Sequence, residues 1–360
     1  MDQPTPSEHA ARFTLPGLKP FLAAGLILLL ALLFLVSLAL GSVAIPVEEV
    51  ARILLGQEPS KAVWVNIVRD FRLPQALTAI LAGSALGIGG LLMQTFFRNP
   101  LADPYILGIS SGASLGVALV VLSVGTVTTT LLTGLGLMGD LALAAAASLG
   151  SALVMALVLA LARRVAGGMT LLIVGLLVGY LTSAAVSLLL YFSIPERIQA
   201  YIAWTFGSFS GVTWDQLAVM TPVVCAGLAA AFLLNKPLNA LLLGEQYAAS
   251  MGVNLLRVRY ALLLTTAVLA GTVTAFCGPI GFIGIAVPHF CRGLFATSDH
   301  RLLVPLTILV GAIVALIAAL IADAPGSRIV LPLNAVTALI GAPAVLWVIL
   351  SRRHTRESFT

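Results

Sequence analysis

Side chains that could do chemistry are scarce in this chain. Asp, Glu, Lys and Arg together make up 9% of its 360 residues. None of the three lysines follows a glycine, so the sequence has no phosphate-binding loop of the GxxxxGK[ST] type. Carboxylates paired at helical spacing, a Ser/His/Asp set and a Cys/His metal cluster are absent too. The sequence therefore predicts no catalytic residue, no metal site, no cofactor and no ATP hydrolysis by this chain.

The few ionisable groups near the apolar segments do not form a transport site for protons or sodium. His289, beside Arg292, is the titratable residue inside a predicted span, and three carboxylates fall at span ends: Asp140, Asp215 and Asp323. A buried charge is expensive in lipid, so carriers driven by an ion gradient usually mark their site with one. The absence of such a buried charge predicts that another protein supplies the energy for transport. The cysteines lie in apolar surroundings and are interpreted as packing residues: Cys225, Cys277 and Cys291.

The composition places the chain in a bilayer. Apolar residues make up 60% of it and the mean hydropathy is +1.08, whereas charged residues alone supply about 25% of an ordinary soluble domain. Residues 21–40 are uncharged and long enough to cross a hydrocarbon core of about 30 Å. They are longer than the apolar part of a signal peptide, and acidic residues precede them. We therefore interpret them as a retained first span.

The predicted fold class is an all-α polytopic membrane protein with about ten transmembrane helices in one domain, residues 21–350. Short tails, 1–20 and 351–360, flank it. The predicted spans are 21–40, 73–97, 105–123, 141–162, 169–192, 217–234, 260–277, 280–294, 302–322 and 333–350, of which the eighth is short and interrupted by glycine and proline.

An even number of spans places both termini on one side. Thirteen of the 19 Lys and Arg residues fall on the side of the termini and six on the other, so both termini are predicted to be cytoplasmic. The basic residues are spread over many short loops, which argues against nucleic-acid binding.

An internal repeat divides the domain into two halves. Thr78–Ser84 reappears as Thr266–Thr272, and at the same offset Gly90 matches Gly278 and Pro100 matches Pro288. The two copies lie in the second and seventh spans, five spans apart, so they cross the membrane in opposite directions. This arrangement predicts two inverted-topology halves.

Two segments outside the spans are candidates for contacts with partners. Residues 235–259, on the cytoplasmic side, read as short amphipathic pieces separated by Gly244 and Gly252. They fit a docking platform and an interfacial helix equally well. On the outer side, Arg69 and Arg72 are three residues apart and would share one helix face. They would pair with carboxylates of an arriving protein or with lipid phosphates, and the spacing does not choose between these.

Several motifs together resemble the permease subunits of ABC importers for ferric siderophores, haem and cobalamin. They are RLPQ (72–75), LAGSALGIGGLLMQTFFRNPLADPYILGISSGAS (81–114), LLGEQYAASMGVN (242–254), CGPIGFIGIAVPHFCR (277–292), SDHR (298–301) and LPLNAVTALIGAP (331–343). The resemblance implies ten spans, a bacterial inner-membrane location, and a homodimer or pair of related permeases. It also implies two cytoplasmic ATPase subunits and an extracytoplasmic substrate-binding protein. A self-sufficient secondary carrier remains the alternative. The sequence does not indicate which substrate is transported.

The resemblance also implies roles for particular residues. The stretch from Gly244 to Val253 matches the segment that couples to the ATPase, and the matching positions are Gly244, Glu245, Ala249 and Gly252. Arg72 and Arg328 match arginines that pair with the binding protein. Gln75 departs from the pattern where a second arginine is common, and Arg69 is the residue that would compensate.

Two further assignments follow from the resemblance. The fifth predicted span would line the pathway with small or weakly polar residues, although helix packing explains them as well: Gly175, Gly179, Thr182 and Ser183. His289 lies in a motif found with varied substrates, so a structural hydrogen bond is preferred over a metal or haem ligand.

Overall fold

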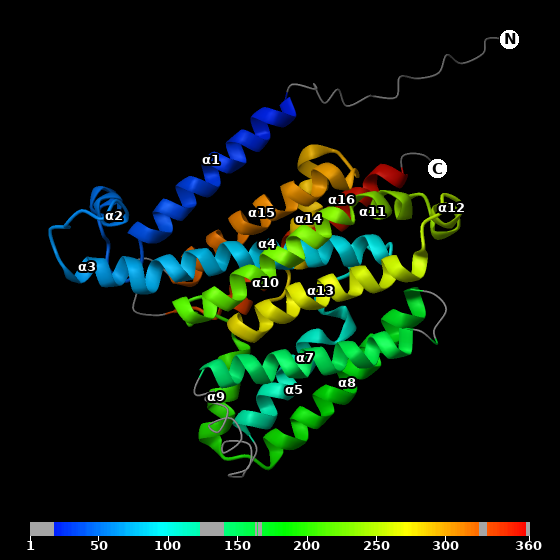
Figure 1. Cartoon of the computed structure of the whole chain (residues 1–360), viewed down its shortest axis with the longest axis horizontal. Coiled ribbons are helices and arrows are strands. Elements are labelled where there is room, and N and C mark those ends of the chain that lie inside the picture. The colour runs from blue at the N-terminus through cyan, green and yellow to red at the C-terminus, as the bar shows by residue number, and fades with distance from the viewer. Residues whose placement is uncertain (1–17, 123–139, 163, 165–167, 324–329, 358–360) are drawn as a thin grey trace.

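The computed structural model describes residues 18–122, 140–162, 164, 168–323 and 330–357. Within these ranges the chain is helical and contains no strand. The longer helices pack side by side with their axes roughly along one direction (Figure 1). Their bounds are α1 Leu18–Ala39, α2 Val47–Leu54, α3 Val63–Asn66, π-helical η1 Ile67–Arg72, α4 Leu73–Phe96, η2 Pro104–Leu107, α5 Ile109–Val121, α7 Asp140–Ala162, α8 Gly168–Tyr191, α9 Pro195–Thr205, α10 Trp214–Leu233, α11 Asn235–Leu242, α12 Glu245–Ser250, α13 Leu255–Cys277, α14 Ile283–Phe295, α15 His300–Ala322 and α16 Leu333–Glu357.

Seven of the described helices are long and apolar enough to cross a membrane. The other three predicted spans coincide with shorter apolar helices, so the count of ten stays a prediction. Gly108, with φ 80°, breaks the third span into η2 and α5. The eighth span begins only after Phe282, with φ 69°, and contains Pro288, which leaves the 13-residue α14. The tenth corresponds to the apolar start of α16, Leu333–Pro343.

Helix α4 is the centre of the bundle. In its most apolar window 83% of the residues are buried, against 6% for α1. Gly83 lies directly against Gly311 of α15, where a Cβ on either glycine would overlap the backbone carbonyl of the other. A Cβ on Gly90 would likewise overlap the backbone carbonyl of Gly284 in α14. The glycines of the repeat thus let backbones approach closely, which is how small residues stabilise helix pairs in membranes.

The two helices that contain the repeat, α4 and α13, run antiparallel. The guanidinium of Arg259, near the start of α13, lies 5.8 Å from the ring centroid of Phe96, the last residue of α4. This is the relative direction predicted for the two copies. The matched glycines nevertheless differ in role, because Gly90 packs within α4 whereas Gly278, with φ 74°, ends α13. The symmetry of the two halves stays a prediction.

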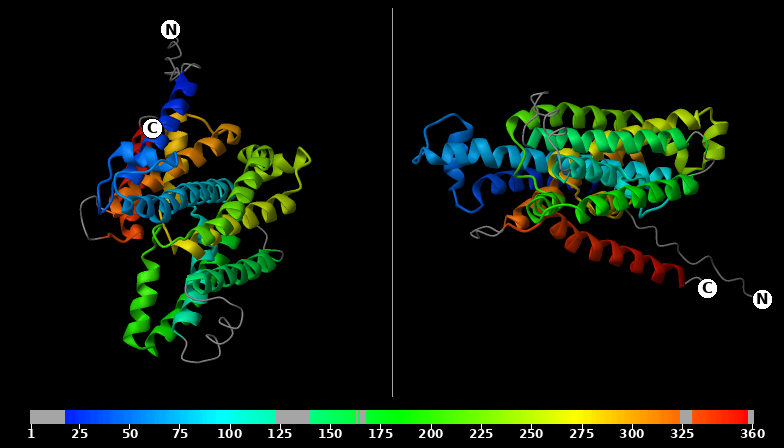
Figure 2. Two further views of the ribbon diagram at one scale, coloured as in Figure 1. Left: turned by 60° about the vertical axis from the view of Figure 1, so that its left-hand side comes forward. Right: turned by 90° about the horizontal axis from the view of Figure 1, so that it is seen from below.

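The two ends of the bundle are built differently. Helices α2 and α3 project at one end, and α11 and α12 lie at the opposite end (Figure 1). Helix α16 packs against α14 and α15 and lies along the outside of the bundle (Figure 2). The two ends of the bundle therefore present different surfaces, one formed by α2 and α3 and the other by α11 and α12.

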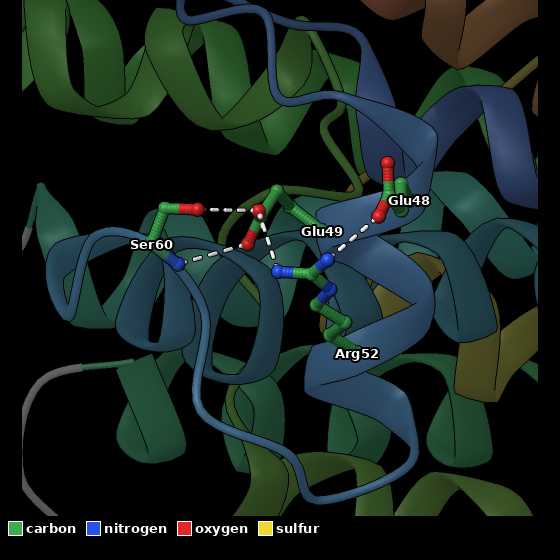
Figure 3. Close-up of polar contacts among 4 residues, drawn as sticks. All are labelled: Glu48, Glu49, Arg52 and Ser60. Carbon is green, nitrogen blue, oxygen red and sulfur yellow. Dashed lines mark hydrogen bonds and ion pairs between the residues drawn. The ribbon is translucent and has the colours of Figure 1, made fainter.

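The carboxylate of Glu49 in α2 binds the loop that follows this helix. Glu49 accepts hydrogen bonds from the backbone N–H of Ser60 at 2.9 Å and from its hydroxyl, while Arg52 reaches both Glu49 and Glu48 (Figure 3). The Ser60 hydroxyl, then its backbone N–H, hold the pKa of Glu49 below its usual value. These contacts fix the loop after α2 without a disulfide.

Candidate functional site

The segment predicted to couple to an ATPase forms two short helices joined by glycine turns. Gly244, with φ 120°, separates α11 from α12, and Gly252, with φ 84°, separates α12 from α13. Both backbone conformations lie in the region that favours glycine. Asn254 then caps α13 by accepting a hydrogen bond from the backbone N–H of Arg257 at 3.0 Å. The glycines therefore set the shape of this segment.

One side of α12 faces the bundle and the other is open. Ala248 is fully buried, Glu245 is half-buried, and Ala249 and Gly252 are exposed. A Cβ added to Gly252 would meet no atom within 4 Å. Large apolar side chains are exposed along the same segment: Leu242, Leu243, Tyr247 and Met251. An exposed apolar cluster of this kind is typical of a contact with another protein or with a membrane.

A groove of 770 Å³ runs beside α12 and is lined by the end of α4, the start of α8 and the residues around Gly244. Arg98, just after α4, donates a hydrogen bond from Nη2 to the carbonyl O of Leu241 at 3.0 Å. Its own φ is 48°, an uncommon value for a residue with a side chain. Sequence reasoning missed Arg98, although it lies in a quoted motif.

Arg72 is buried rather than presented at the surface. Its side chain is 7% exposed, and Nη1 donates hydrogen bonds to the carbonyl oxygens of Leu38 at 2.8 Å and Ala39 at 2.9 Å, while Nη2 donates to that of Val43. The last carbonyls of a helix have no partner within it and carry partial negative charge. The guanidinium therefore caps the end of α1. Docking through Arg72 stays a prediction, and in this structure three of its five N–H groups donate to these carbonyls.

Arg69 takes a different direction from Arg72, so the two do not form a pair on one face. Arg69 is exposed and donates a hydrogen bond to the carbonyl O of Ile53 at 3.1 Å. The carbonyl of Arg69 in turn accepts the indole N–H of Trp214 at 2.9 Å, which links η1 to the start of α10. Arg328 lies outside the described residues.

Gln75 occupies the position where the resemblance led us to expect arginine. Its amide nitrogen donates to Oδ2 of Asp323 at 2.6 Å. Asp323 follows the last residue of α15, so this bond joins the first turn of α4 to the end of α15. Neutral glutamine thus supplies a contact between helices here, and the structure gives no sign that Arg69 replaces it.

Three of the four predicted pathway residues lie on the packed side of α8. A Cβ on Gly175 would lie 2.9 Å from the carbonyl of Ile106 in η2, and one on Gly179 would lie 3.5 Å from the hydroxyl of Ser111. Thr182 is buried and its hydroxyl bonds to the backbone of its own helix. Helix packing explains these three, and Ser183 alone is exposed.

His289 is buried beside a short polar chain. Its Nδ1 lies 3.2 Å from the carbonyl of Ile285, one turn earlier in α14, as the preferred structural role requires. Next to it, Arg292 Nη1 donates to Oε1 of Gln94 at 2.6 Å, and Gln94 Nε2 donates to the backbone of α14. Among the described residues no three His, Cys, Asp or Glu side chains come close enough to hold a metal ion.

The profile of the FecCD transport family matches residues 29–351. The chain belongs to this family. It is 37% identical over 332 residues to the vitamin B12 import system permease protein BtuC of Klebsiella pneumoniae, covering 91% of this chain and 93% of that protein. It is 35% identical to the hemin transport system permease protein HmuU of Yersinia pestis, covering 94% and 98%.

A solved structure agrees with this FecCD assignment in its fold. The structure, described as an inward-facing conformation of a metal-chelate type ABC transporter, matches with a TM-score of 0.78 and 30% identity. The match covers 93% of this chain and 99% of that one. The bundle of this FecCD protein is therefore a transport fold over almost its whole length.

Proposed function

We propose that this FecCD family chain is the permease subunit of an ABC importer that moves a large metal chelate, a haem or a corrinoid across the bacterial inner membrane. The relatives named for vitamin B12 and hemin transport support this substrate class, as does the resemblance of its motifs to siderophore permeases. In the proposed topology both termini and the α11–α12 end face the cytoplasm. The α2–α3 end faces outward.

The observation that carries the proposal is the exposed coupling segment. Helix α12 is held to the bundle through Ala248, while Tyr247 and Met251 are exposed at its surface. The groove beside it offers 770 Å³ for an inserted partner element. We infer that two ATPase subunits bind at this end of a permease dimer, and that their ATP-driven closure acts through the segment from Gly244 to Val253.

The opposite end is proposed to receive a substrate-binding protein. Arg69 is exposed there, and Arg328 lies between α15 and α16 in the sequence; both are proposed to pair with carboxylates of that protein. Arg72 is proposed to act with them by holding the end of α1 beside this surface. Pairs of arginine with carboxylate at a rim mainly set orientation and association rate.

The pathway is proposed to follow the exposed face of α8 at the seam between two copies. Only 28% of the most apolar window of α8 is buried in the single chain. Tyr180, Ser183 and Ser187 are spaced three and four residues apart and are all exposed, so they share one face. Weakly polar side chains of this kind suit a passage that must release its cargo.

Uptake into proteoliposomes tests the proposal. The chain is purified with its ATPase subunits, reconstituted, and supplied with its binding protein and cyanocobalamin, haemin or a ferric siderophore. ATP-dependent accumulation of one of these compounds is the expected result. Uptake driven by an ion gradient in the absence of ATPase subunits would contradict the proposal and indicate a secondary carrier.

A further inference from the structure

His300 lies where the coupling segment meets the core of the bundle. It is the first residue of α15 and is fully buried. Its Nε2 is 2.9 Å from the hydroxyl oxygen of Thr95 in α4, and its Nδ1 is 2.8 Å from Oδ1 of Asn239 in α11. One imidazole ring therefore contacts α4 and α11 while its backbone begins α15.

The partners of Asn239 determine which nitrogen of the ring has the proton. Asn239 Nδ2 donates to Oδ1 of Asp299 at 2.6 Å, and its Oδ1 accepts from the backbone N–H of His300 at 2.9 Å. The backbone N–H of Arg301, and then the Asn239 amide, keep the pKa of Asp299 below its usual range, so this carboxylate is an acceptor. The orientation of the Asn239 amide is thereby fixed.

The partners of Asn239 and Thr95 also determine which ring nitrogen of His300 donates and which accepts. Because Oδ1 of Asn239 can only accept, the neutral ring of His300 must donate from Nδ1. Its Nε2 is then the acceptor toward Thr95, whose single hydroxyl hydrogen is shared between this nitrogen and the carbonyl O of Leu91, each 2.9 Å from the hydroxyl oxygen. All these polar groups have partners, and a buried network that is fully satisfied is rigid.

Other contacts between α11 and the core are less directional. Leu238 is fully buried and Leu241 nearly so, but apolar contacts permit sliding because they have no preferred geometry. Arg98 adds one bond, to the carbonyl of Leu241. The end of α4 therefore reaches α11 directly through Arg98 and, three residues earlier, through Thr95 and the ring of His300.

We propose that His300 is a positioning residue that transmits movement of the coupling segment into α4 and α15. The inference rests on the proposed function, because it presumes that an ATPase moves the segment from Gly244 to Val253. A displacement of α12 pulls on α11, and the directional bonds through Asn239 and Thr95 pass it to α4. Helix α4 and α15 then move as one body because Gly83 and Gly311 are in backbone contact.

The substitution Thr95→Val tests the proposal, since it keeps the shape of the side chain and removes one hydroxyl. Thr78→Val is the matched control, because Thr78 lies in the same helix, is fully buried, and its hydroxyl has no partner in this structure. The assay measures uptake and ATP hydrolysis in the same proteoliposomes, with whichever of cyanocobalamin, haemin or a ferric siderophore the wild type transports. The expected result is that uptake per ATP falls about fivefold in Thr95→Val and is unchanged in Thr78→Val.

A second variant separates transmission from stability. His300→Asn retains an amide to bond with Asn239 but does not reach Thr95, so it is expected to lower uptake per ATP as much as Thr95→Val does. A merely structural role would lower the unfolding temperature while leaving uptake per ATP at the wild-type value, and that result would overturn the proposal. Failure of the proposed function would show in the wild type instead, as no uptake on adding ATP.

Discussion

The substitution Gly252→Trp separates the docking role of the coupling segment from its fold. A Cβ at Gly252 meets no atom within 4 Å, so the cost at this position is the backbone strain of a φ of 84°. That strain is about 1 kcal/mol. An indole at this exposed turn obstructs a partner that fits against α12. Loss of a central contact costs about 2 kcal/mol, which weakens ATPase association by about 30-fold.

Gly56→Trp is the matched control at the other end of the molecule. Gly56 also has a positive φ, 76°, and no atom within 4 Å of an added Cβ. Both variants therefore carry the same strain and the same added apolar surface. The assay is the affinity of the purified chain for its ATPase subunits in detergent, together with the unfolding temperature of each variant. Equal affinities for the two variants would refute the reasoning, whereas a loss confined to Gly252→Trp supports it.

Three further predictions concern stability. Gly83→Ala forces α4 away from α15 and is expected to cost about 1–3 kcal/mol, seen as a lower unfolding temperature. Arg72→Ala leaves the carbonyls at the end of α1 without their donors and is expected to cost about 1–3 kcal/mol in the same measurement. Because the pKa of Glu49 is lowered, its contribution is complete above the usual pKa of 4.5 and is lost as the pH falls through the folded-state pKa. Lowering the pH through this range is therefore expected to destabilise the Glu49→Gln variant less than the wild type.

A control variant or a comparison with the wild type tests each of these three predictions. Gly25→Ala is the control for Gly83, because a Cβ on Gly25 meets no neighbour. Arg69→Ala is the control for Arg72, since Arg69 is exposed and gives up only one bond to a carbonyl. If Arg72→Ala weakens docking of the binding protein while leaving the unfolding temperature unchanged, the capping role is wrong. Identical acid-unfolding curves for wild type and Glu49→Gln would contradict the pKa argument.

Features that depend on local sequence could be predicted well. Glycine is the residue type that lets α4 pack closely at Gly83 and Gly90, and Gly244 and Gly252 marked the turns on either side of α12. Both follow from the small size or the backbone freedom of glycine, which can be recognised without knowing any neighbour. The antiparallel direction of α4 and α13 followed from counting the spans between them, even though one of these, the third, is a shorter helix.

Features that depend on distant partners were missed. Arg72 read as a surface arginine because its acceptors, the carbonyls at the end of α1, lie 33 and 34 residues earlier and backbone carbonyls leave no mark in a sequence. For Gly175 and Gly179 the sequence left a pathway role and helix packing open, and their contacts with Ile106 and Ser111 become visible only once the chain is folded. Asn239 and His300 are 61 residues apart, and the sequence did not indicate their pairing although His300 lies in the quoted SDHR motif.

The most direct test of the account measures ATP-dependent uptake with the energy source as the only variable. Proteoliposomes containing the chain and its ATPase subunits are given binding protein and substrate, with ATP inside or with an imposed proton or sodium gradient. The account predicts accumulation only with ATP, and its loss in Gly252→Trp but not in Gly56→Trp. Accumulation with a gradient alone, at the same rate in both variants, would contradict it.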